Sequence, residues 1–298
     1  MSEQSNQKSN PNDPSVRFLY GTFLGRLILE LCLFLKIPAI LGLFLRSPFS
    51  RFYIKSFIKK NKIDMTDFSD YKESGLCDKT KGAKHFRSFN DFFTRKKSEQ
   101  SLKISAEDGD LISPCDSLLS VFKIEADSVF RVKGFDYSLS DFFDSAEFSE
   151  KFAGGDCLIF RLCATDYHRF CFVDSGSLGE TRFIPGKLYS VQPIACENYR
   201  VYTKNRRFWS ILNTTHFGSV AQIEVGAFSV GGIVNHKKTG ESFEKGEEKG
   251  FFDLHGSTIV LLFEREKISL VPEILSGTSG GAEFRVKYGQ KIGFSKNE

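Results

Sequence analysis

Short apolar runs separated by turn residues occupy most of the chain beyond residue 110, and this pattern limits the fold more than any other feature. Short runs bounded by Gly, Pro, Asn, Asp or Ser are typical of β-strands. The runs are LISP (111–114), LLSVF (118–122), CLIFRL (157–162), HRFCFV (168–173), SVAQIEVGAFSVGGIV (219–234) and STIVLLFE (257–264). Strands do not alternate with long helices, which argues against a doubly wound α/β fold. We therefore predict an α+β fold with a mainly β core of short, largely antiparallel strands, preceded by N-terminal amphipathic helices.

The most apolar part of the chain is the segment 18–45. It is interrupted by three charged residues and a proline: Arg26, Glu30, Lys36 and Pro38. No uninterrupted apolar stretch reaches the roughly 18 to 20 residues that a bilayer crossing needs. We expect one or two helices that lie in a membrane interface with the apolar face down. The alternative is a helical hairpin packed on the protein's own core, because an apolar face does not identify its partner.

The segment that follows predicts a basic amphipathic helix. Basic residues recur at helical spacing, while aromatic residues recur on another face: Arg51, Lys55, Lys59 and Lys62, against Phe49, Tyr53 and Phe57. Farther along, Ser88 or Asn90 is a candidate cap for a short helix. The expected organisation is a flexible polar tail over 1–17, a membrane-associating helical segment over 18–65, and a main domain over 66–298.

Composition excludes some classes of protein. The hydrophobic fraction of 41% and the charged fraction of 26% are those of a soluble globular protein. A net charge of +4, without a basic stripe carrying stacking aromatics, gives no reason to expect a nucleic-acid partner. The seven cysteines include no C-x-x-C pair, which favours a reducing compartment.

Three polar residues stand next to predicted strands: Asp116, His168 and Ser257. Each alone has an ordinary explanation, as a turn former, a structural histidine or a loop serine. Together they are the residue types by which a carboxylate orients a base that activates a hydroxyl. The signatures of phosphate-binding loops, zinc proteases and serine hydrolases are absent, and the glycine-rich stretch 225–234 indicates a strand pair with a close backbone approach instead.

The chain resembles the phosphatidylserine decarboxylases, which are pyruvoyl-dependent, self-cleaving proenzymes, over roughly residues 85–293. The resemblance rests on blocks that occur in order along the chain. They are FNDFFTR (89–95), SPCD (113–116), VKGFDYSL (132–139), RLCATDYHR (161–169), PGKLYSV (185–191), VGA (225–227), VGGI (230–233), KGE (245–247) and FDLHGSTI (252–259). We would not expect so many blocks to match in order by chance.

The resemblance implies self-cleavage of the Gly256–Ser257 bond, which yields a β chain that ends at Gly256 and an α chain from Ser257 to Glu298. Glycine suits the position before the nucleophile because it tolerates a strained backbone. Ser257 then becomes a covalent pyruvoyl group, which decarboxylates phosphatidylserine to phosphatidylethanolamine through a Schiff base. No metal and no pyridoxal phosphate is implied.

The resemblance also assigns roles to residues. Asp116 matches the aspartate that orients the self-cleavage base, Ser257 the nucleophile, and His168 the histidine of the decarboxylation step. The family's second histidine, often the self-cleavage base, is replaced by Cys171. Three candidates for that base remain: His168 serving both steps, His255 beside the bond, and Cys171 as a thiolate.

The resemblance leaves the substrate contacts and the setting of the enzyme as expectations. Ser190 and Tyr167 are candidate substrate-binding residues. Expected partners are phosphatidylserine in an anionic membrane, the two chains of one precursor, and a second copy in a homodimer. The expected location is the cytoplasmic face of the cell membrane, as a peripheral protein. Two alternatives are a non-catalytic lipid-binding relative and a pyruvoyl decarboxylase of a soluble amino acid.

Overall fold

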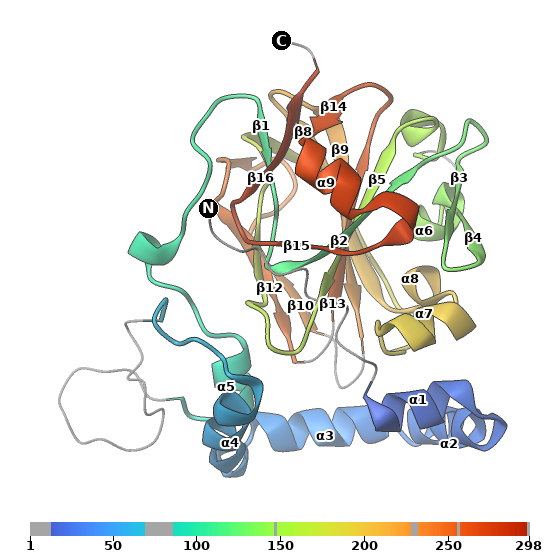
Figure 1. Ribbon diagram of the computed structural model, residues 1–298, viewed down its shortest axis with the longest axis vertical. Helices are drawn as coiled ribbons and strands as arrows, with labels where there is room; N and C mark the ends of the chain where they lie inside the picture. The colour runs from blue at the N-terminus through green and yellow to red at the C-terminus, as the bar shows by residue number, and fades with distance from the viewer. Residues whose placement is uncertain (1–12, 69–85, 146–147, 228–231, 255–256, 297–298) are drawn as a thin grey trace.

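The computed structural model describes residues 13–68, 86–145, 148–227, 232–254 and 257–296. Helices near the N-terminus precede a β-rich body, and in the described residues every ladder between named strands is antiparallel (Figure 1). The predicted α+β class is therefore confirmed.

The N-terminal segment forms α1 (Pro14–Gly21), α2 (Phe23–Phe34), α3 (Ile37–Arg46) and α4 (Phe52–Asn61), with a 3₁₀ turn at Pro48–Arg51 before α4. Local chemistry sets their ends. The Asp13 carboxylate accepts from the Ser15 N–H at the start of α1, and the Thr22 hydroxyl accepts from the Gly25 N–H at the start of α2. Because α1 begins at Pro14, residues 14–17 are helical, although they belong to the segment 1–17 that we expected to be a flexible tail.

The predicted short helix beyond these is also present. Helix α5 (Phe89–Phe93) is capped by the Ser88 hydroxyl, which accepts from the Asp91 N–H at 3.1 Å. Its phenylalanines 89, 92 and 93 are buried, so this helix is fixed to the body by its aromatic face.

The body is built on a sheet of eight strands in the order β11-β7-β8-β9-β13-β5-β2-β15. In chain order they are β2 (Ser117–Lys123), β5 (Asp156–Leu162), β7 (Gly176–Ile184), β8 (Arg207–Thr214), β9 (Gly218–Gly226), β11 (Ser242–Phe243), β13 (Ser257–Phe263) and β15 (Phe284–Val286). Every residue of β13 is buried, because one core covers Ile259 and Leu261 and another covers Val260 on the opposite face.

Smaller elements cover both faces of this sheet. One three-stranded sheet contains β6 (Arg169–Cys171), β10 (Gly232–Asn235) and β12 (Glu248–Asp253), and another contains β1 (Asp110–Ile112), β14 (Ile268–Leu270) and β16 (Lys291–Ser295). The remaining elements are the hairpin of β3 (Val129–Val132) and β4 (Phe135–Ser138), and helices α6 (Leu139–Phe143), α7 (Pro193–Asn198), α8 (Val201–Lys204) and α9 (Pro272–Gly277).

The glycine-rich stretch does not form the expected strand pair. Its first half ends β9, which pairs with β8 and β13, whereas its second half begins β10, which pairs with β12 in another sheet. The chain therefore changes sheets within this stretch, and residues 228–231 lie outside the described residues.

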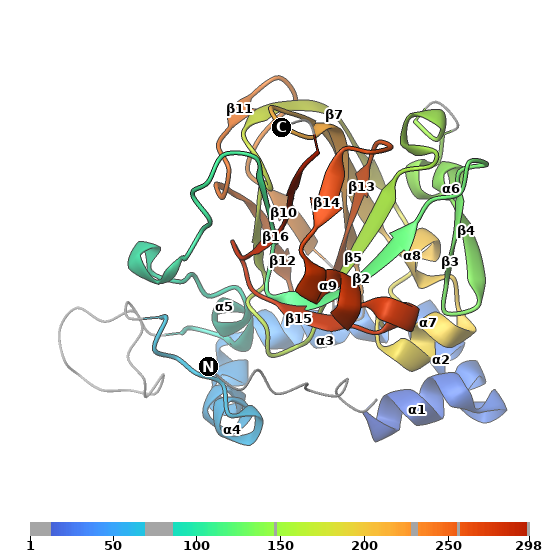
Figure 2. The ribbon, with the colours of Figure 1, turned by 45° about the horizontal axis from the view of Figure 1, so that its top comes forward.

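Helices α1 to α4 lie across the end of the body where β12 ends and β13 begins, as two views agree (Figures 1 and 2). Tyr20, Leu29 and Ile54 are buried on the inner side of this layer. Among the described residues, large exposed hydrophobic side chains gather between Phe18 and Tyr53. The layer therefore packs on the protein's own core and also presents an apolar outer surface.

In the described part of the chain, no single helix is long and apolar enough to cross a membrane. The pair Phe23–Phe34 and Ile37–Arg46, bent by 63°, passes the same test of length and composition when taken together.

Candidate active site

Ser257 is the first residue of β13 and lies between two strands. It pairs with Leu162 of β5 on one side and with Gly226 of β9 on the other. Its side chain is fully buried, and its Oγ has no hydrogen-bond partner among the described residues. A buried hydroxyl without a partner costs roughly 1 to 3 kcal/mol, and Ser210 of β8 shares this feature. His255 and Gly256 lie outside the described residues.

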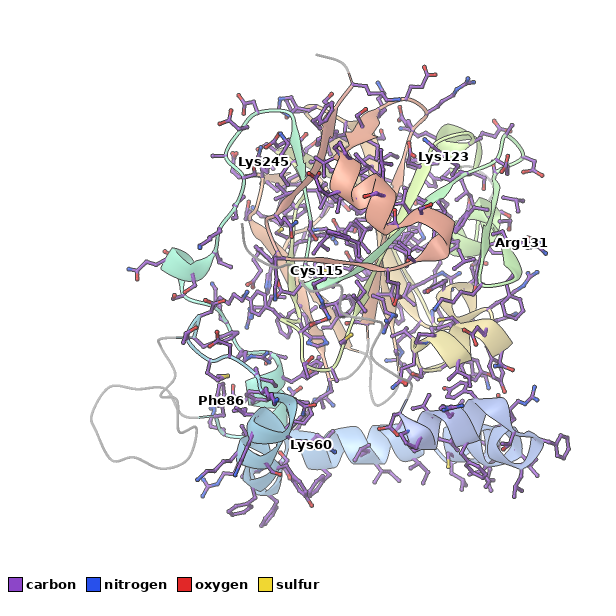
Figure 3. All side chains as sticks on the ribbon, viewed as in Figure 1. Lys60, Phe86, Cys115, Lys123, Arg131 and Lys245 are labelled. Atoms are coloured by element: carbon purple, nitrogen blue, oxygen red, sulfur yellow. The ribbon has the colours of Figure 1, made fainter. Side chains whose placement is uncertain are left out.

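Asp116 lies between β1 and β2 and is held from several directions. Its Oδ1 accepts from the Tyr288 N–H at 2.8 Å, while its Oδ2 lies 3.4 Å from Lys97 Nζ and 3.7 Å from Lys287 Nζ. The side chain is only 7% exposed. Figure 3 shows the neighbouring Cys115 in the interior of the body. The carboxylate therefore occupies a fixed position beside two positive charges.

The sheet register relates Asp116 to Ser257. Leu118 of β2 pairs with Arg161 of β5, and the next residue of β5, Leu162, pairs with Ser257. Since neighbouring strands lie about 4.8 Å apart, the start of β2 is about 10 Å from Ser257. In the described residues the Asp116 carboxylate contacts Tyr288, Lys97 and Lys287, and the Ser257 hydroxyl has no hydrogen-bond partner.

His168 immediately precedes β6 and is fully buried. Its Nδ1 lies 2.9 Å from the carbonyl oxygen of Asp166, and its ring packs on the Phe93 ring of α5 with centroids 3.8 Å apart. A carbonyl only accepts, so Nδ1 carries the hydrogen in this contact and Nε2 keeps the lone pair of the neutral ring. The imidazole is thus held in a tautomer that can act as a base through Nε2.

Cys171, at the end of β6, is a buried thiol. Its Sγ lies 3.6 Å from the Pro114 carbonyl oxygen and 3.9 Å from that of Ser113. Burial raises the pKa of this thiol to about 12. The group is therefore protonated near neutral pH, which disfavours it as the self-cleavage base.

Ser190 lies in the loop after β7, and hydrogen bonds connect this loop to β9, the strand that pairs with β13 at Ser257. Its N–H donates to Tyr20 Oη at 2.7 Å. On the other side of the loop, the Asn205 amide donates to the carbonyls of Tyr189 and Gly226, each at 2.8 Å. Because Gly226 pairs with Ser257, one asparagine links the Ser190 loop to the end of the sheet that carries Ser257.

Tyr167 lies nearer to Asp116 than to the Ser190 loop. Its Oη accepts from the Lys97 N–H at 3.3 Å, and its ring meets the Tyr288 ring edge-on with centroids 5.7 Å apart. A cleft of about 810 Å³ opens beside these residues. Its polar lining includes Arg95, Lys97, Asp116, Tyr167, Arg285 and Lys287. Asp116 and Tyr167 therefore meet at this cleft, whereas Ser257, His168 and Ser190 do not line it.

The residues predicted from the sequence do not include a buried ion pair that lies beside β13, the strand of Ser257. Glu224 lies opposite Ile259 in the sheet and contacts Lys249 Nζ at 2.8 Å, with both side chains at most 2% exposed. Burial raises the pKa of Glu224 and lowers the pKa of Lys249, while the attraction between them opposes both shifts. The overlooked signal was a charged residue inside an apolar strand run, which rarely lacks a partner.

The chain is similar to one family over most of its length. A family model described as phosphatidylserine decarboxylase matches residues 89–294. A relative from Clostridium acetobutylicum, named phosphatidylserine decarboxylase proenzyme 2, is 42% identical over 282 residues, which cover 93% of this chain and 91% of that protein. A phosphatidylserine decarboxylase proenzyme from Clostridium tetani is 41% identical over 256 residues, which cover 85% of this chain and 82% of that protein.

Proposed function

Because the chain belongs to the phosphatidylserine decarboxylase family, we propose that it is a proenzyme that cleaves its Gly256–Ser257 bond and then decarboxylates phosphatidylserine to phosphatidylethanolamine. The observation that carries this proposal is the position of Ser257, buried as the first residue of β13 within the part of the chain that the family model matches. A hydroxyl that acts as a nucleophile at this position needs a base within hydrogen-bond reach to take its proton.

Self-cleavage would begin when Ser257 Oγ attacks the carbonyl carbon of Gly256 and gives up its proton to a base. The peptide C–N bond breaks, the nitrogen takes a proton, and an ester joins Gly256 to Ser257. Loss of the Cα proton of Ser257 and rupture of its Cβ–O bond release the β chain as a carboxylate. The dehydroalanine that remains takes up water and loses ammonia to become the pyruvoyl group.

We assign the base of the first step to His168, because its neutral tautomer leaves Nε2 able to take a proton. Asp116 would stabilise the protonated ring from its fixed position between two lysines. His255, two residues before Ser257, remains the alternative base and lies outside the described residues. Cys171 is the weakest candidate because its pKa is raised.

The pyruvoyl group would supply a carbonyl that accepts electrons when carbon dioxide leaves. The residues around Ser257 fit such a group, since its position is buried and flanked by strands on both sides. In our proposal Ser190, whose loop Asn205 links to Gly226 opposite Ser257, orients the polar part of the substrate, and His168 handles the proton exchanged at the substrate carbon. Tyr167 lies at the cleft beside Asp116 and is not assigned to the same contact.

The two chains would remain associated after the cut. Residues 257–298 supply β13, β14, β15, β16 and α9, and β13 is hydrogen-bonded on both edges inside the main sheet. Removing that strand would expose a segment that is buried on both faces and apolar from Ile259 to Phe263, which is strongly unfavourable. This supports a main catalytic domain over 66–298 made of both chains.

The helix layer would seat the enzyme on an anionic membrane as a peripheral protein of the cytoplasmic face. Its outer surface carries exposed phenylalanines, of which Phe23 is 84% and Phe34 82% exposed. Basic side chains follow in α4, where Lys55 and Lys59 are exposed. Apolar insertion together with positive charge is the combination that holds an interfacial helix on anionic lipid.

Intact mass measurement of the purified chain tests the proposed function. We expect two polypeptides, one ending at Gly256 and one beginning with a pyruvoyl group in place of Ser257. We also expect vesicles that contain phosphatidylserine to gain phosphatidylethanolamine when they are incubated with the protein. A single uncut chain in an active preparation would contradict the proposal, and activity on free serine alone would favour the soluble-substrate alternative.

Replacing Phe23 and Phe34 together with serine should weaken binding to vesicles by about tenfold or more per phenylalanine, because each ring leaves an apolar environment. Flotation with phosphatidylcholine vesicles that contain phosphatidylserine measures this change. The matched control is the double replacement of Phe183 and Phe294, which are 52% and 42% exposed but lie outside the helix layer. Equal flotation of both variants would exclude the layer as the membrane contact.

A further inference from the structure

The chain approaches the scissile bond through a conformation that is rare for its residue type. Leu254 has φ of 55°, in the left-handed region that a branched side chain seldom occupies, and it is fully buried. It is the last described residue before His255 and Gly256. Backbone strain of this kind persists only where surrounding contacts enforce it. Contacts near Leu254 must therefore hold this turn.

One such contact is an ion pair on the preceding residue. Asp253 ends β12, and its Oδ2 accepts a hydrogen bond from the guanidinium of Arg46, the last residue of α3. Opposite Asp253 in the ladder is Gly232, where a Cβ would lie 2.9 Å from Asp253 Cβ and 3.1 Å from Oδ2. The glycine thus leaves room for the carboxylate to take this position.

The turn that follows Arg46 also contacts α5, the helix that packs on His168. Ser50, in the 3₁₀ turn after Arg46, accepts a hydrogen bond from the Phe89 N–H at 2.8 Å, at the start of α5. Phe93 of α5 packs on the His168 ring. The bend at 46–50 therefore touches the segment before the scissile bond and the helix behind the proposed base.

We infer that Arg46 is a positioning residue for self-cleavage, which it promotes by holding Asp253 and so fixing the strained turn from which the chain enters the Gly256–Ser257 bond. This inference rests on the proposed function. Among the described residues Arg46 acts through its contact with Asp253, so its effect is on geometry. An intramolecular attack depends steeply on the approach of its atoms, and a loosened turn lowers the fraction of molecules in the reactive arrangement.

The test is the rate at which newly made proenzyme converts into two chains, followed on denaturing gels after cell-free synthesis. We expect Arg46→Met to slow conversion by roughly tenfold and Asp253→Asn to slow it similarly. The double variant should be no slower than either single one, because both remove one interaction. Arg46→Lys should restore most of the rate. Arg51→Met, in the same layer but stacked on Phe52, is the matched control and should convert normally.

A structural defect and a positioning defect are separated by a second measurement. Once converted, Arg46→Met enzyme should decarboxylate at the wild-type rate per α chain, whereas a damaged fold would lower that rate too. Wild-type conversion by both Arg46→Met and Asp253→Asn would overturn the inference and leave the proposed function intact. A wild-type chain that never converts would instead overturn the proposed function, and the inference with it.

Discussion

Replacing Ser257 with alanine should leave the chain in one piece and abolish decarboxylation, because the variant has no hydroxyl to attack the Gly256 carbonyl and no precursor of the pyruvoyl group. Intact mass should give one polypeptide of full length, and product formation from phosphatidylserine vesicles should fall to background. The variant should fold at least as stably as the wild-type precursor, since it loses a buried hydroxyl without a partner among the described residues.

Ser210 offers a matched control for this experiment. It is a serine in β8 of the same sheet, it is fully buried, and its Oγ likewise has no hydrogen-bond partner among the described residues. Ser210→Ala therefore removes an equivalent group two strands away from β13. We expect this variant to mature and to decarboxylate normally. Normal maturation of Ser257→Ala, or equal loss in both variants, would show that the start of β13 has no special role.

The strands that can be predicted from the sequence are those buried on both faces. The runs of β5 and β13 are apolar at nearly every position because cores cover both sides of the sheet there. Strand β7, in contrast, has only two buried residues among nine, at Leu178 and Ile184. Because β7 has no apolar run, its sequence does not predict a strand, although it pairs along much of β8. Sequence patterns therefore show strands that are mostly buried and miss a strand such as β7, most of whose residues are partly or fully exposed.

The candidate site divides in a similar way. Asp116, His168 and Ser257 can be identified because each stands beside a predicted strand within a family block. Lys97 and Lys287 cannot, since an isolated lysine in a sequence is normally a surface residue. These lysines lie beside Asp116 only because segments far apart in the chain pack together. The same is true of Tyr288, whose backbone N–H donates to the Asp116 carboxylate. Patterns locate the candidate reacting groups, and packing supplies the charges around Asp116.

Replacing His168 with asparagine should separate the two proposed roles of this histidine. The asparagine amide can still donate to the Asp166 carbonyl, so the local contact is kept while the titrating ring is lost. Removal of a general base costs typically 10²- to 10⁴-fold in rate. If His168 serves both steps, conversion into two chains and decarboxylation by any converted enzyme should each fall by about this factor. Conversion rates from gels and turnover per α chain measure the two steps independently.

His216 provides the control, because it also pairs with a carboxylate, with Nδ1 3.0 Å from Asp174 Oδ1, but lies at the turn between β8 and β9, away from Ser257. His216→Asn should leave both rates unchanged. If His168→Asn converts normally but decarboxylates slowly, the base for cleavage would be His255 and not His168. His255→Ala should then block conversion. Cys171→Ser should have little effect in either case, because a thiol with a pKa of about 12 carries its proton near neutral pH.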